Sequence, residues 1–501
     1  MAQYCIGVAA QSRPEHTALI VTKDADTAAP VEMWTYHDLE NAVLRVAAGL
    51  IERGFEKGSR ILIRLDNTST YPILLFGANA AGLVPVAASS QLTASEAEFL
   101  LADCEASAVA IAADLPRGDI PKHVAVLDEA DVRAMMRHRT RASYAATDRE
   151  DPGYMLYTSG TTARPKGVVH AQRVAIGRSP TYQSWYGITP DDRMLHAGAF
   201  NWTYTLGTGL IDPWANGATS IIYAGTKTPE IWPNLIRKSG ATLFAAVPSL
   251  MRQILKYAPP GPIDLGALRH GLIAGEKPPL DLFDAWKART GTELYEALGM
   301  SEISTYISTS PSVPRKAGTA GKPQKGRRIV ILPVEDGTDP LPTGHEGLIA
   351  IHRSDPGLML GYWKRPEEER EVYRGEWFLG GDIGVEDDEG YITHVGRAND
   401  IIKALGYRIA PQEIEAVLSH CPGVAEVACT EVKVRSDVSV VGAFIVRQPG
   451  SKLSAEDIHD YAAGRLATYK RPREVVFVDA LPRTSNGKVK RSALTAARSQ
   501  A

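Results

Sequence analysis

The chain has 501 residues, which is too long for one hydrophobic core and predicts two or three domains. A hydrophobic share of 44%, a charged share of 23% and a formal net charge of -3 are ordinary for a globular protein and give no reason to expect nucleic acid as a partner. The opening MAQYCIGVAAQSRPEH lacks a basic region followed by an apolar stretch, and no later run approaches the roughly 18 apolar residues that span a bilayer. We therefore expect a cytoplasmic protein without a membrane span.

Two rounds of alternating strands and helices occupy the first two thirds of the chain. In the first round, strand-like RILIRL precedes a helix closed by Gly82, and a later helix opens with Thr93 and Glu96 at capping-box spacing. The second round runs from the strand TSIIYAG through three helices to ELYEALG. This rhythm predicts two doubly wound parallel sheets.

After about Arg327 the pattern changes to hairpins with Gly, Asp and Pro in their turns, which predicts an antiparallel or β-barrel-like subdomain over residues 327–398. The last roughly hundred residues read as helix, two strands and helix, a size that suits an independent domain. The expected fold is thus α/β, with a large N-terminal domain (1–398) and a small, mobile α+β C-terminal domain (399–501). The four cysteines, Cys5, Cys104, Cys421 and Cys429, show no metal-ligand spacing, so we expect reduced core thiols.

The loop YTSGTTARPKGVVH, residues 157–170, concentrates hydroxyl groups, glycines and cations just before a helical pattern. Hydroxyl and backbone N–H donors with little steric bulk suit a polyphosphate. The loop is not a Walker A sequence, because five residues separate Gly160 from Lys166 and no Gly-Lys-Ser/Thr step follows. Taken alone, it could equally be a Ser/Thr-rich surface linker.

Four further motifs follow the loop: YEALGMSE (295–302), WFLGGD (377–382), GRANDIIKALGYRIAPQEIE (396–415) and LPRTSNGKVKR (481–491). In this order and spacing the five motifs resemble the signature set of the adenylate-forming superfamily, which includes acyl-CoA synthetases, firefly luciferase and the adenylation domains of peptide synthetases. The resemblance covers about residues 30–495. It implies a ligase that activates a carboxylic acid with Mg·ATP to an acyl adenylate and passes the acyl group to coenzyme A, releasing AMP and pyrophosphate.

The resemblance also implies roles for individual residues. A carboxylate that attacks the α-phosphate crowds negative charge, so positioned cations and donors are needed. Glu302 matches the family's magnesium carboxylate, a ligand type that Mg²⁺ prefers, and Asp382 matches the acid that accepts both ribose hydroxyls. Each residue alone could be a turn residue or a solvated charge. The implied nucleotide-binding set is Thr158, Ser159, Gly160, Thr161, Thr162, Lys166, Gly275, Glu276, Leu298, Gly299, Met300, Ser301, Asp382 and Arg397, and the implied catalytic set is Lys488, Thr161 and Glu302.

Lys488 matches the catalytic lysine on the family's mobile domain, although a lysine in a basic tail is ordinarily just solvated. Its ammonium would bridge the incoming carboxylate and the α-phosphate. The resemblance places a hinge at Asn399, about which the C-terminal domain would alternate between the two half-reactions. The loop with Lys403, Gly406 and Tyr407 would then line the tunnel for the pantetheine arm of coenzyme A.

Four positions depart from the commonest family pattern. Ala163 replaces a glycine of the loop, and Leu298 replaces the aromatic ring that often stacks on adenine. FLGGD lacks the usual threonine before Asp382, and Asn399 stands where an aspartate or lysine commonly forms the hinge. These departures bear on nucleotide affinity and on the hinge rather than on the chemistry.

The substrate is indicated by the segment GAFNWTYTLG, residues 198–207, hereafter the acyl segment. Amino-acid-activating relatives carry an aspartate near its start, whereas this chain has Asn201, so we expect an acid without an α-amino group, either aryl or short-to-medium acyl. Core packing is the alternative reading of its aromatic residues. The predicted acyl pocket is Phe200, Asn201, Trp202, Tyr204 and Ala274.

Two rival functions stay open at this point: an acyl-AMP ligase that loads a carrier protein, and a non-catalytic nucleotide-binding protein of the same fold. The intact Lys488 and Glu302 argue against the second. The oligomeric state is left open, with a homodimer as one option.

Overall fold

The computed structural model describes residues 1–158, 165–398, 400, 402–404, 407–435, 438–483 and 489–497. The chain divides into two compact units. The first comprises Met1–Ile329, Ile351–Phe378 and Glu389–Ile392, and the second comprises Val330–Ala350, Leu379–Asp388 and Thr393–Ala501. The expected domain boundary at residue 399 stays a prediction, because that residue lies outside the described ranges.

A seven-stranded sheet of the first unit has the order β18-β8-β7-β4-β3-β5-β6. Its strands are β3 (Arg60–Arg64), β4 (Val84–Ala87), β5 (Ala106–Ile111), β6 (Ala125–Leu127), β7 (Pro152–Thr158), β8 (Lys166–Ala171) and β18 (Gly361–Tyr362). Strands β7, β4, β3, β5 and β6 are mutually parallel, as the strand–helix rhythm predicts. Its helices are α2 (Tyr36–Glu52), α3 (Thr70–Ala80), α4 (Ala94–Asp103) and α5 (Glu129–Met136).

Local sequence signals fix the ends of these helices. The predicted capping box of α4 is present, with Thr93 and Glu96 each bonding to the other's backbone N–H. Gly82 adopts a left-handed φ of 79° just after α3. Helix α2, which the sequence reading did not single out, packs on α3, and a Cβ at Gly77 would lie 2.6 Å from Val46.

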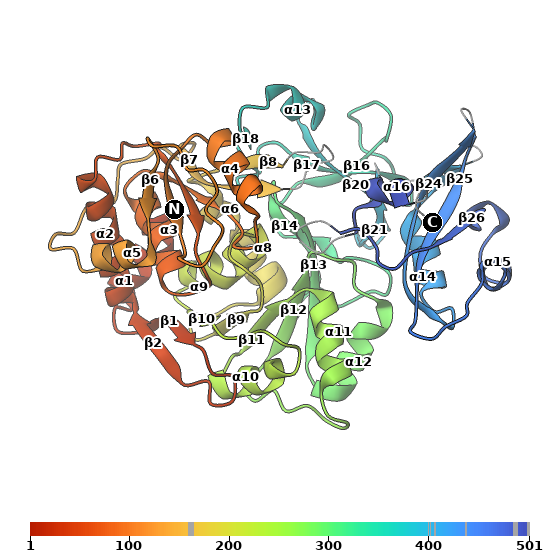
Figure 1. Cartoon of the computed structure of the whole chain (residues 1–501), viewed down its shortest axis with the longest axis horizontal. Coiled ribbons are helices and arrows are strands. Elements are labelled where there is room, and N and C mark those ends of the chain that lie inside the picture. Colours follow the sequence, from red (N-terminus) through yellow and green to blue (C-terminus); the bar gives the residue numbers. More distant parts are fainter. Residues whose placement is uncertain are drawn as a thin grey trace. The chain divides into compact units, whose positions relative to one another are not determined.

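A second sheet of nine strands has the order β15-β14-β13-β12-β11-β9-β10-β1-β2. Its strands are β1 (Thr17–Thr22), β2 (Pro30–Thr35), β9 (Arg193–His196), β10 (Thr219–Tyr223), β11 (Leu243–Ala246), β12 (His270–Ala274), β13 (Glu293–Met300), β14 (Ser304–Ser308) and β15 (Lys322–Pro323). The six strands from β13 to β1 are parallel, which confirms the second wound sheet. The predicted helices are α10 (Ile231–Ser239), α11 (Pro248–Tyr257) and α12 (Leu280–Thr290), and α11 and α12 lie side by side next to strands β11–β13 (Figure 1).

Short helices connect the strands of the two sheets and form the opening of the chain. They are η1 (Gln3–Gly7), α1 (Val8–Ser12), α6 (Val174–Gly177), α7 (Ser179–Thr181), η2 (Tyr182–Tyr186), α8 (Thr203–Leu206), η3 (Gly207–Ile211) and α9 (Asp212–Ala215). A buried ion pair joins two of these regions: Arg178 and Asp212 are 1% and 0% exposed. Arg178 also donates a hydrogen bond to the Ser304 hydroxyl at the start of β14.

The hairpin-rich segment forms a five-stranded sheet with the order β16-β17-β20-β19, in which β21 also pairs with β20. The elements are β16 (Ile329–Leu332), β17 (Glu346–His352), α13 (Pro366–Glu371), β19 (Tyr373–Arg374), β20 (Trp377–Glu386) and β21 (Ile392–Arg397). The β-rich character is as predicted. Among the described strands the order is open, so the likeness to a barrel is not confirmed.

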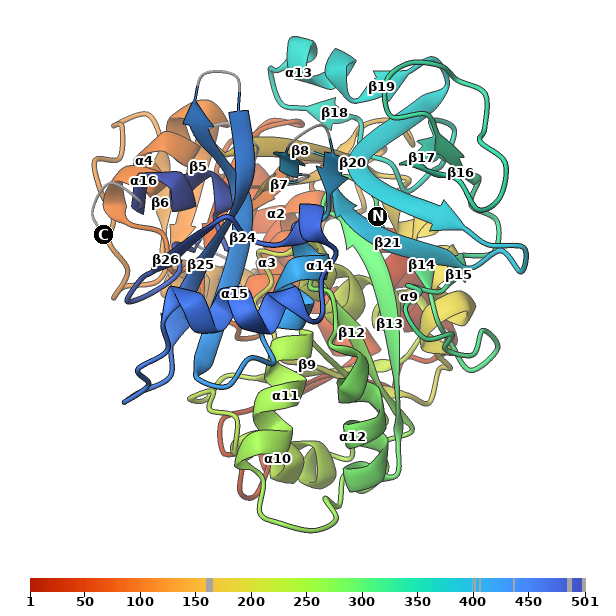
Figure 2. The ribbon, with the colours of Figure 1, turned by 90° about the vertical axis from the view of Figure 1, so that its right-hand side faces the viewer.

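The last part of the chain is an α+β arrangement, as predicted. Its elements are β22 (Ile402–Ala404), β23 (Tyr407–Ile409), α14 (Pro411–Leu418), β24 (Val424–Arg435), β25 (Val438–Arg447), α15 (Ala455–Ala463), η4 (Thr468–Lys470), β26 (Glu474–Phe477), η5 (Arg491–Ala493) and α16 (Leu494–Ala497). Figure 2 shows α15 lying across the front of the β24–β25–β26 sheet. The core between them includes Ile414, Cys429, Ile445 and Ile458.

All four cysteines are free and buried, which confirms their interpretation as core thiols. Among the described residues, none of the helices combines the length and the apolar character that crossing a bilayer requires.

Candidate functional site

The predicted phosphate loop connects two antiparallel strands, β7 and β8, with Thr158 opposite Lys166 in the register. The sequence reading placed a helical pattern directly after the loop. Helix does follow, from Val174 in α6, but the last part of the loop segment itself forms β8, because Val168 and Val169 are β-branched residues that pair with Leu156 and Met155. Ser159, Gly160, Thr161, Thr162 and Ala163 lie outside the described residues.

Glu302 lies in the tight turn, residues 301–303, that joins the antiparallel strands β13 and β14. The turn follows a register shift between Leu298 and Gly299, and a Cβ at Gly299 would lie 2.4 Å from the Ser304 carbonyl oxygen. Only glycine allows this approach of two backbones. The hairpin therefore gathers the predicted residues Leu298, Gly299, Met300, Ser301 and Glu302 at one end of the nine-stranded sheet.

Tyr362 brings Lys166 and Glu302 to the same place. Strand β18 pairs with β8, so that Tyr362 lies opposite Val168. The Tyr362 hydroxyl donates to Glu302 Oε1 at 2.8 Å, and Lys166 Nζ lies over the Tyr362 ring, 5.1 Å from its centroid. Lys166 also forms an ion pair with Glu368 of α13. Two predicted residues that lie 136 positions apart, 166 and 302, are thus connected through one aromatic side chain.

His170 holds the same turn from β8. Its Nε2 lies 2.8 Å from the Ser301 carbonyl oxygen, and its ring stacks on Tyr154 with centroids 4.8 Å apart. Burial lowers the pKa of His170 to about 4, so the ring is neutral and Nε2–H donates to Ser301. The turn that carries Glu302 is therefore fixed by His170 through the backbone and by Tyr362 through the carboxylate.

Two residues of the predicted nucleotide-binding set, Gly275 and Glu276, directly follow β12. Ala274 ends that strand and is paired with Ala297, and Gly275 takes a left-handed φ of 92°, with Val247 Cγ1 3.7 Å from the position of an added Cβ. Glu276 accepts hydrogen bonds from the Ser249 N–H and hydroxyl groups, at 3.1 Å and 3.2 Å, in the first turn of α11. In this structure Glu276 thus stabilises the N-terminus of α11, where a carboxylate is favoured.

The acyl segment runs from the end of β9 into α8. Phe200 is buried with its ring 5.4 Å from that of Tyr71, whereas Asn201 and Trp202 are half-buried. The Tyr204 hydroxyl donates to the carbonyls of Ala246 and Leu272, at 3.1 Å and 3.0 Å. Since β9, β11 and β12 are parallel neighbours, the segment lies at their carboxyl ends, the usual place for a ligand in an open α/β sheet.

Asp382 of the second unit is 2% exposed and lies beside two residues of the neighbouring strand β21, His394 and Arg397. His394 Nε2 is 3.0 Å from Asp382 Oδ1, and Arg397 Nε is 3.1 Å from the same oxygen. The structure therefore brings together two residues of the predicted nucleotide-binding set, Asp382 and Arg397, and adds His394 to them. A carboxylate oxygen that already contacts two neighbouring donor side chains is held in a fixed orientation toward further donors.

Several predicted residues cannot be placed. Lys488, Gly406 and Asn399 lie outside the described residues. Lys403 and Tyr407 belong to the hairpin of β22 and β23, where they pair with Arg408 and Ala404. Their roles stay predictions.

The donor set at Glu302 suits magnesium. Tyr362 occupies one carboxylate oxygen of Glu302, and the other belongs to the ligand class that Mg²⁺ prefers. A magnesium ion in nucleotide sites is commonly bound through one or two carboxylates together with phosphate oxygens and water. Glu302 would hold it here.

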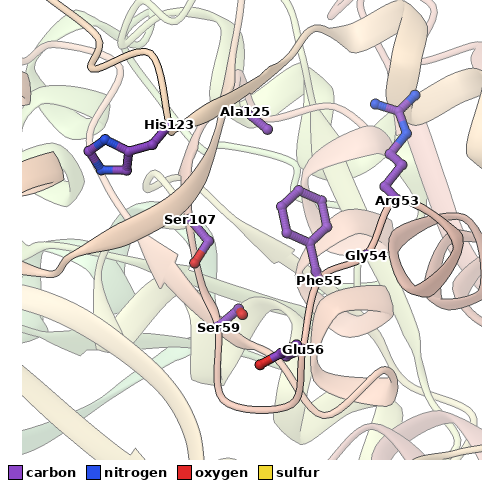
Figure 3. A pocket seen from close by; sticks show the side chains of 8 residues that line it. All are labelled: Arg53, Gly54, Phe55, Glu56, Ser59, Ser107, His123 and Ala125. Atoms are coloured by element: carbon purple, nitrogen blue, oxygen red, sulfur yellow. The ribbon is translucent and has the colours of Figure 1, made fainter.

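A separate pocket of about 600 Å³ opens beyond the end of α2, beside the sheet edge formed by β5 and β6 (Figure 3). It is lined by Arg53, Gly54, Phe55, Glu56, Ser59, Ser107, His123 and Ala125. Arg53 is already paired with Asp131 at 2.8 Å. The pocket includes none of the predicted site residues.

Sequence reasoning missed Tyr362, His170, Glu368 and His394. The motif reading covered neither the strand that carries Tyr362 nor the pairing that aligns it with β8. The sequence points only weakly to His394, which lies three residues before Arg397 in a stretch typical of an ordinary hairpin strand. Each contact joins two different elements of the fold, which no local sequence pattern predicts.

Comparison with known proteins agrees with this geometry. Residues 7–363 match the family model described as AMP-binding enzyme, and residues 413–488 match AMP-binding enzyme C-terminal domain. A benzoate–CoA ligase of Thauera aromatica is 31% identical over 483 residues, covering 93% of this chain and 91% of the relative. A long-chain-fatty-acid–CoA ligase of Mycobacterium tuberculosis is 30% identical, covering 92% of each protein.

Among solved structures, a benzoate–CoA ligase from Burkholderia xenovorans LB400 superimposes with a TM-score of 0.86 at 28% identity, covering 99% of both chains. The family match spans more than half of the chain and carries the loop, the Glu302 turn and the acyl segment. The chain therefore belongs to the AMP-binding enzyme family, as an AMP-forming acid–CoA ligase that activates a carboxylic acid with ATP and transfers the acyl group to coenzyme A.

Proposed function

We propose that this ligase acts on an aromatic carboxylic acid without an α-amino group. The observation that carries the proposal is the composition of the acyl segment, which places aromatic rings and no carboxylate at the carboxyl ends of β9, β11 and β12. The benzoate specificity named for two relatives, in sequence and in structure, supports the same choice.

Two aromatic residues of the segment pack against aromatic rings of other elements. Phe200 packs on Tyr71, and Tyr204 packs on Trp185 with ring centroids 5.8 Å apart. Rigid rings of this kind favour a flat aryl group, because offset and edge contacts add to the area that the ligand buries. A long acyl chain, which the fatty-acid relative is named for, would gain less from these rings.

An α-ammonium group would find no counter-charge in the segment. Asn201 stands near its start, and residues 198–207 contain neither aspartate nor glutamate. A buried ammonium without a carboxylate partner costs several kcal/mol, on the order of the penalties for unpaired buried ions. We therefore expect the deaminated acids, rather than the corresponding amino acids, to be the substrates.

The residues around Tyr362 supply the charge stabilisation that adenylation needs. Lys166 would meet the phosphates, and Glu302 would hold magnesium, which offsets negative charge on the transferring phosphate when bound. Lys166 is paired with Glu368 in this structure, so a phosphate group would replace that carboxylate. Asp382 would accept the ribose hydroxyls, oriented by His394 and Arg397.

Lys488 and Gly406 would divide the two half-reactions. Lys488→Ala is expected to abolish adenylate formation while leaving thioester synthesis from a supplied aryl adenylate. Gly406→Leu is expected to obstruct the pantetheine arm and so to impair only the second step, and Asn399→Pro to slow that step by stiffening the hinge. Equal impairment of both steps by both Lys488→Ala and Gly406→Leu would refute this division.

The substrate proposal is tested by acid-dependent exchange of pyrophosphate into ATP. Benzoate, 3-phenylpropanoate, L-phenylalanine and octanoate are compared at equal concentration with the purified chain. The aromatic acids should exceed both L-phenylalanine and octanoate on the order of 10²-fold, since an unpaired buried ammonium cannot be accommodated. Preference for the amino acid or for the fatty acid would contradict the proposal. Asn201→Asp is the matched variant, because it should shift the ratio toward L-phenylalanine.

A further inference from the structure

The backbone of the acyl segment and of the residues before it is held by three polar side chains. Asn67 Nδ2 donates to the Gly198 carbonyl oxygen at 2.8 Å, and Lys227 Nζ donates to the Ala197 carbonyl oxygen at 3.1 Å. The Gly198 N–H donates to His196 Nδ1 at 2.9 Å. These contacts satisfy local backbone groups and fix the path of the chain from His196 to Phe200.

His196 is left with one unused donor. Burial lowers its pKa to about 3, aided by the nearby Lys227 ammonium, so the imidazole is neutral. Because Nδ1 accepts from Gly198, the ring proton lies on Nε2. Nε2 is buried and has no hydrogen-bond partner among the residues that the structure describes.

Two hydroxyl groups near the segment are unused in the same way. Tyr71 is 1% exposed and Thr203 is 7% exposed, and neither hydroxyl has a partner in the described part of the chain. Most buried side-chain polar atoms in native proteins are hydrogen-bonded, since an unpaired one costs about 1 to 3 kcal/mol. Three such atoms around one segment need a common explanation.

Phe200 lies close to two of these side chains, Tyr71 and His196. The Tyr71 ring lies 5.4 Å from the Phe200 ring. A Cβ built on Gly209 would lie 3.2 Å from His196 Cβ and 3.7 Å from Phe200 Cε1, so His196 and Phe200 flank the same glycine. The His196 ring also packs edge-on against Tyr204 at 4.5 Å, next to Thr203 in sequence.

We propose that the aromatic acid bound at this segment carries a ring hydroxyl group, recognised by His196 Nε2–H together with the Tyr71 and Thr203 hydroxyls. The proposal rests on the proposed function and adds the substituent to it. His196 requires an acceptor, whereas Tyr71 and Thr203 can each accept or donate. A ring hydroxyl is both acceptor and donor, so it satisfies His196 and one of the two hydroxyl groups at once.

Other substituents match this set of groups less well. An aromatic amino group donates but is a poor acceptor, which leaves Nε2–H unpaired. A halogen or methyl group leaves all three groups unpaired. A second carboxylate accepts from His196 but brings a further buried charge.

The wild-type chain is tested first, with kcat/KM for CoA thioester formation measured on benzoate, its three hydroxy isomers, its three amino isomers and the benzenedicarboxylates. One hydroxy isomer should exceed benzoate and the matching amino isomer on the order of 10- to 100-fold. Equal activity on benzoate and all hydroxy isomers, or a preference for an amino or dicarboxylate isomer, overturns the hydroxyl proposal and leaves the aromatic ligase intact. Absence of thioester with every aromatic acid overturns the proposed function itself.

Variants then assign the contacts. Tyr71→Phe and Thr203→Val keep the shape and remove one hydroxyl, and His196→Asn keeps an acceptor for the Gly198 N–H while removing the distant donor. Each should lower the ratio of hydroxy isomer to benzoate on the order of 3- to 10-fold. Ser220→Ala is the control, because Ser220 lies outside the acyl segment, opposite Met194 in strand β10, and carries a buried hydroxyl without a partner among the described residues.

The ratio should stay unchanged in Ser220→Ala. A ratio that falls equally in Ser220→Ala, or that survives in all three variants at the segment, overturns the assignment. A fold defect does not obscure the result, because the ratio compares two acids on the same protein and the wild-type panel needs no variant.

Discussion

Two buried polar clusters of the first unit differ in how completely they use their hydrogen-bonding groups. In the first, Arg178 donates to both carboxylate oxygens of Asp212, at 2.7 Å and 2.5 Å, and Tyr186 adds a bond of 2.7 Å. In the second, His196, Tyr71 and Thr203 each have one polar atom without a hydrogen-bond partner in the part of the chain that the structure describes. We infer from this difference that the first cluster stabilises the fold and that the second is available to bind a ligand.

A glycine lies close to each cluster. A Cβ at Gly207 would lie 2.0 Å from Arg178 Nη2, and a Cβ at Gly209, two residues further on, would lie 3.2 Å from His196 Cβ and 3.7 Å from Phe200 Cε1. Both clusters are therefore closely packed by protein atoms. The difference between them lies in hydrogen bonding, which is complete between Arg178 and Asp212 but leaves three polar atoms of the second cluster without a partner among the described residues.

The largest effect is expected from breaking the completed cluster. Asp212→Ala leaves the Arg178 guanidinium buried without its counter-charge and should lower the free energy of unfolding by about 3 to 5 kcal/mol. Chemical denaturation measures this. Arg178→Met combined with Asp212→Leu should recover much of the loss, and Asp191→Ala, at an exposed ion pair, should cost less than about 1 kcal/mol. A loss at Asp212 no larger than at Asp191 would contradict the structural role.

A buried carboxyl of the YEALG motif gives the next largest effect, and it depends on pH. Burial raises the pKa of Glu296 from 4.5 to about 7, against the opposing charges of Lys277 and Arg315. The folded state therefore holds a proton that the unfolded chain has lost, so stability falls as the pH rises from about 4.5 to 7 and the loss is complete above that range.

Glu296→Gln removes this penalty. The variant should be more stable than the wild type at pH 8 by as much as about 3 kcal/mol, and nearly equal to it at pH 4. The difference between the two unfolding curves isolates Glu296 from other titrating groups. A variant that is less stable at pH 8 would show that the ionised carboxylate is well stabilised in the folded protein.

Local sequence patterns predict much of the fold but little of the difference between these two clusters. The capping box at Thr93 and the glycine turn after α3 depend on neighbouring residues, and the sequence predicts both correctly. Tyr362 and Glu302 lie 60 residues apart, and Asn67 and Gly198 lie 131 apart. Such contacts depend on how distant parts of the chain pack together. The motifs therefore predict Glu302 and Lys166 but not the Tyr362 ring that lies between them.

Tyr362 is an intermediate case, a partnered group that positions a functional one. Tyr362→Phe removes the hydrogen bond to Glu302 and should lower kcat/KM for Mg·ATP on the order of 10-fold, while raising the Mg²⁺ concentration needed for half-maximal rate. Tyr223→Phe is the control, since the Tyr223 hydroxyl donates to the Thr226 carbonyl oxygen away from this site. An unchanged magnesium requirement would mean that Tyr362 only packs against its neighbours.

The smallest effect compares two buried tyrosines. The Tyr36 hydroxyl donates to the Ala218 carbonyl oxygen at 2.6 Å, whereas the Tyr71 hydroxyl has no partner among the described residues. Tyr36→Phe should therefore destabilise by about 1 kcal/mol, and Tyr71→Phe should leave stability unchanged or slightly higher. Thermal unfolding of the two variants without substrate measures this. Equal destabilisation would mean that Tyr71 has a structural partner.

Product analysis tests the central claim, that this chain joins an aromatic acid to coenzyme A at the expense of ATP, most directly. Purified protein is incubated with benzoate or its hydroxy isomers, Mg·ATP and coenzyme A, and the thioester and nucleotide products are quantified together. We predict one aryl-CoA for each AMP, with no ADP, and no AMP release when the acid is left out. AMP release without a thioester, or a thioester formed only on a carrier protein, would contradict the account.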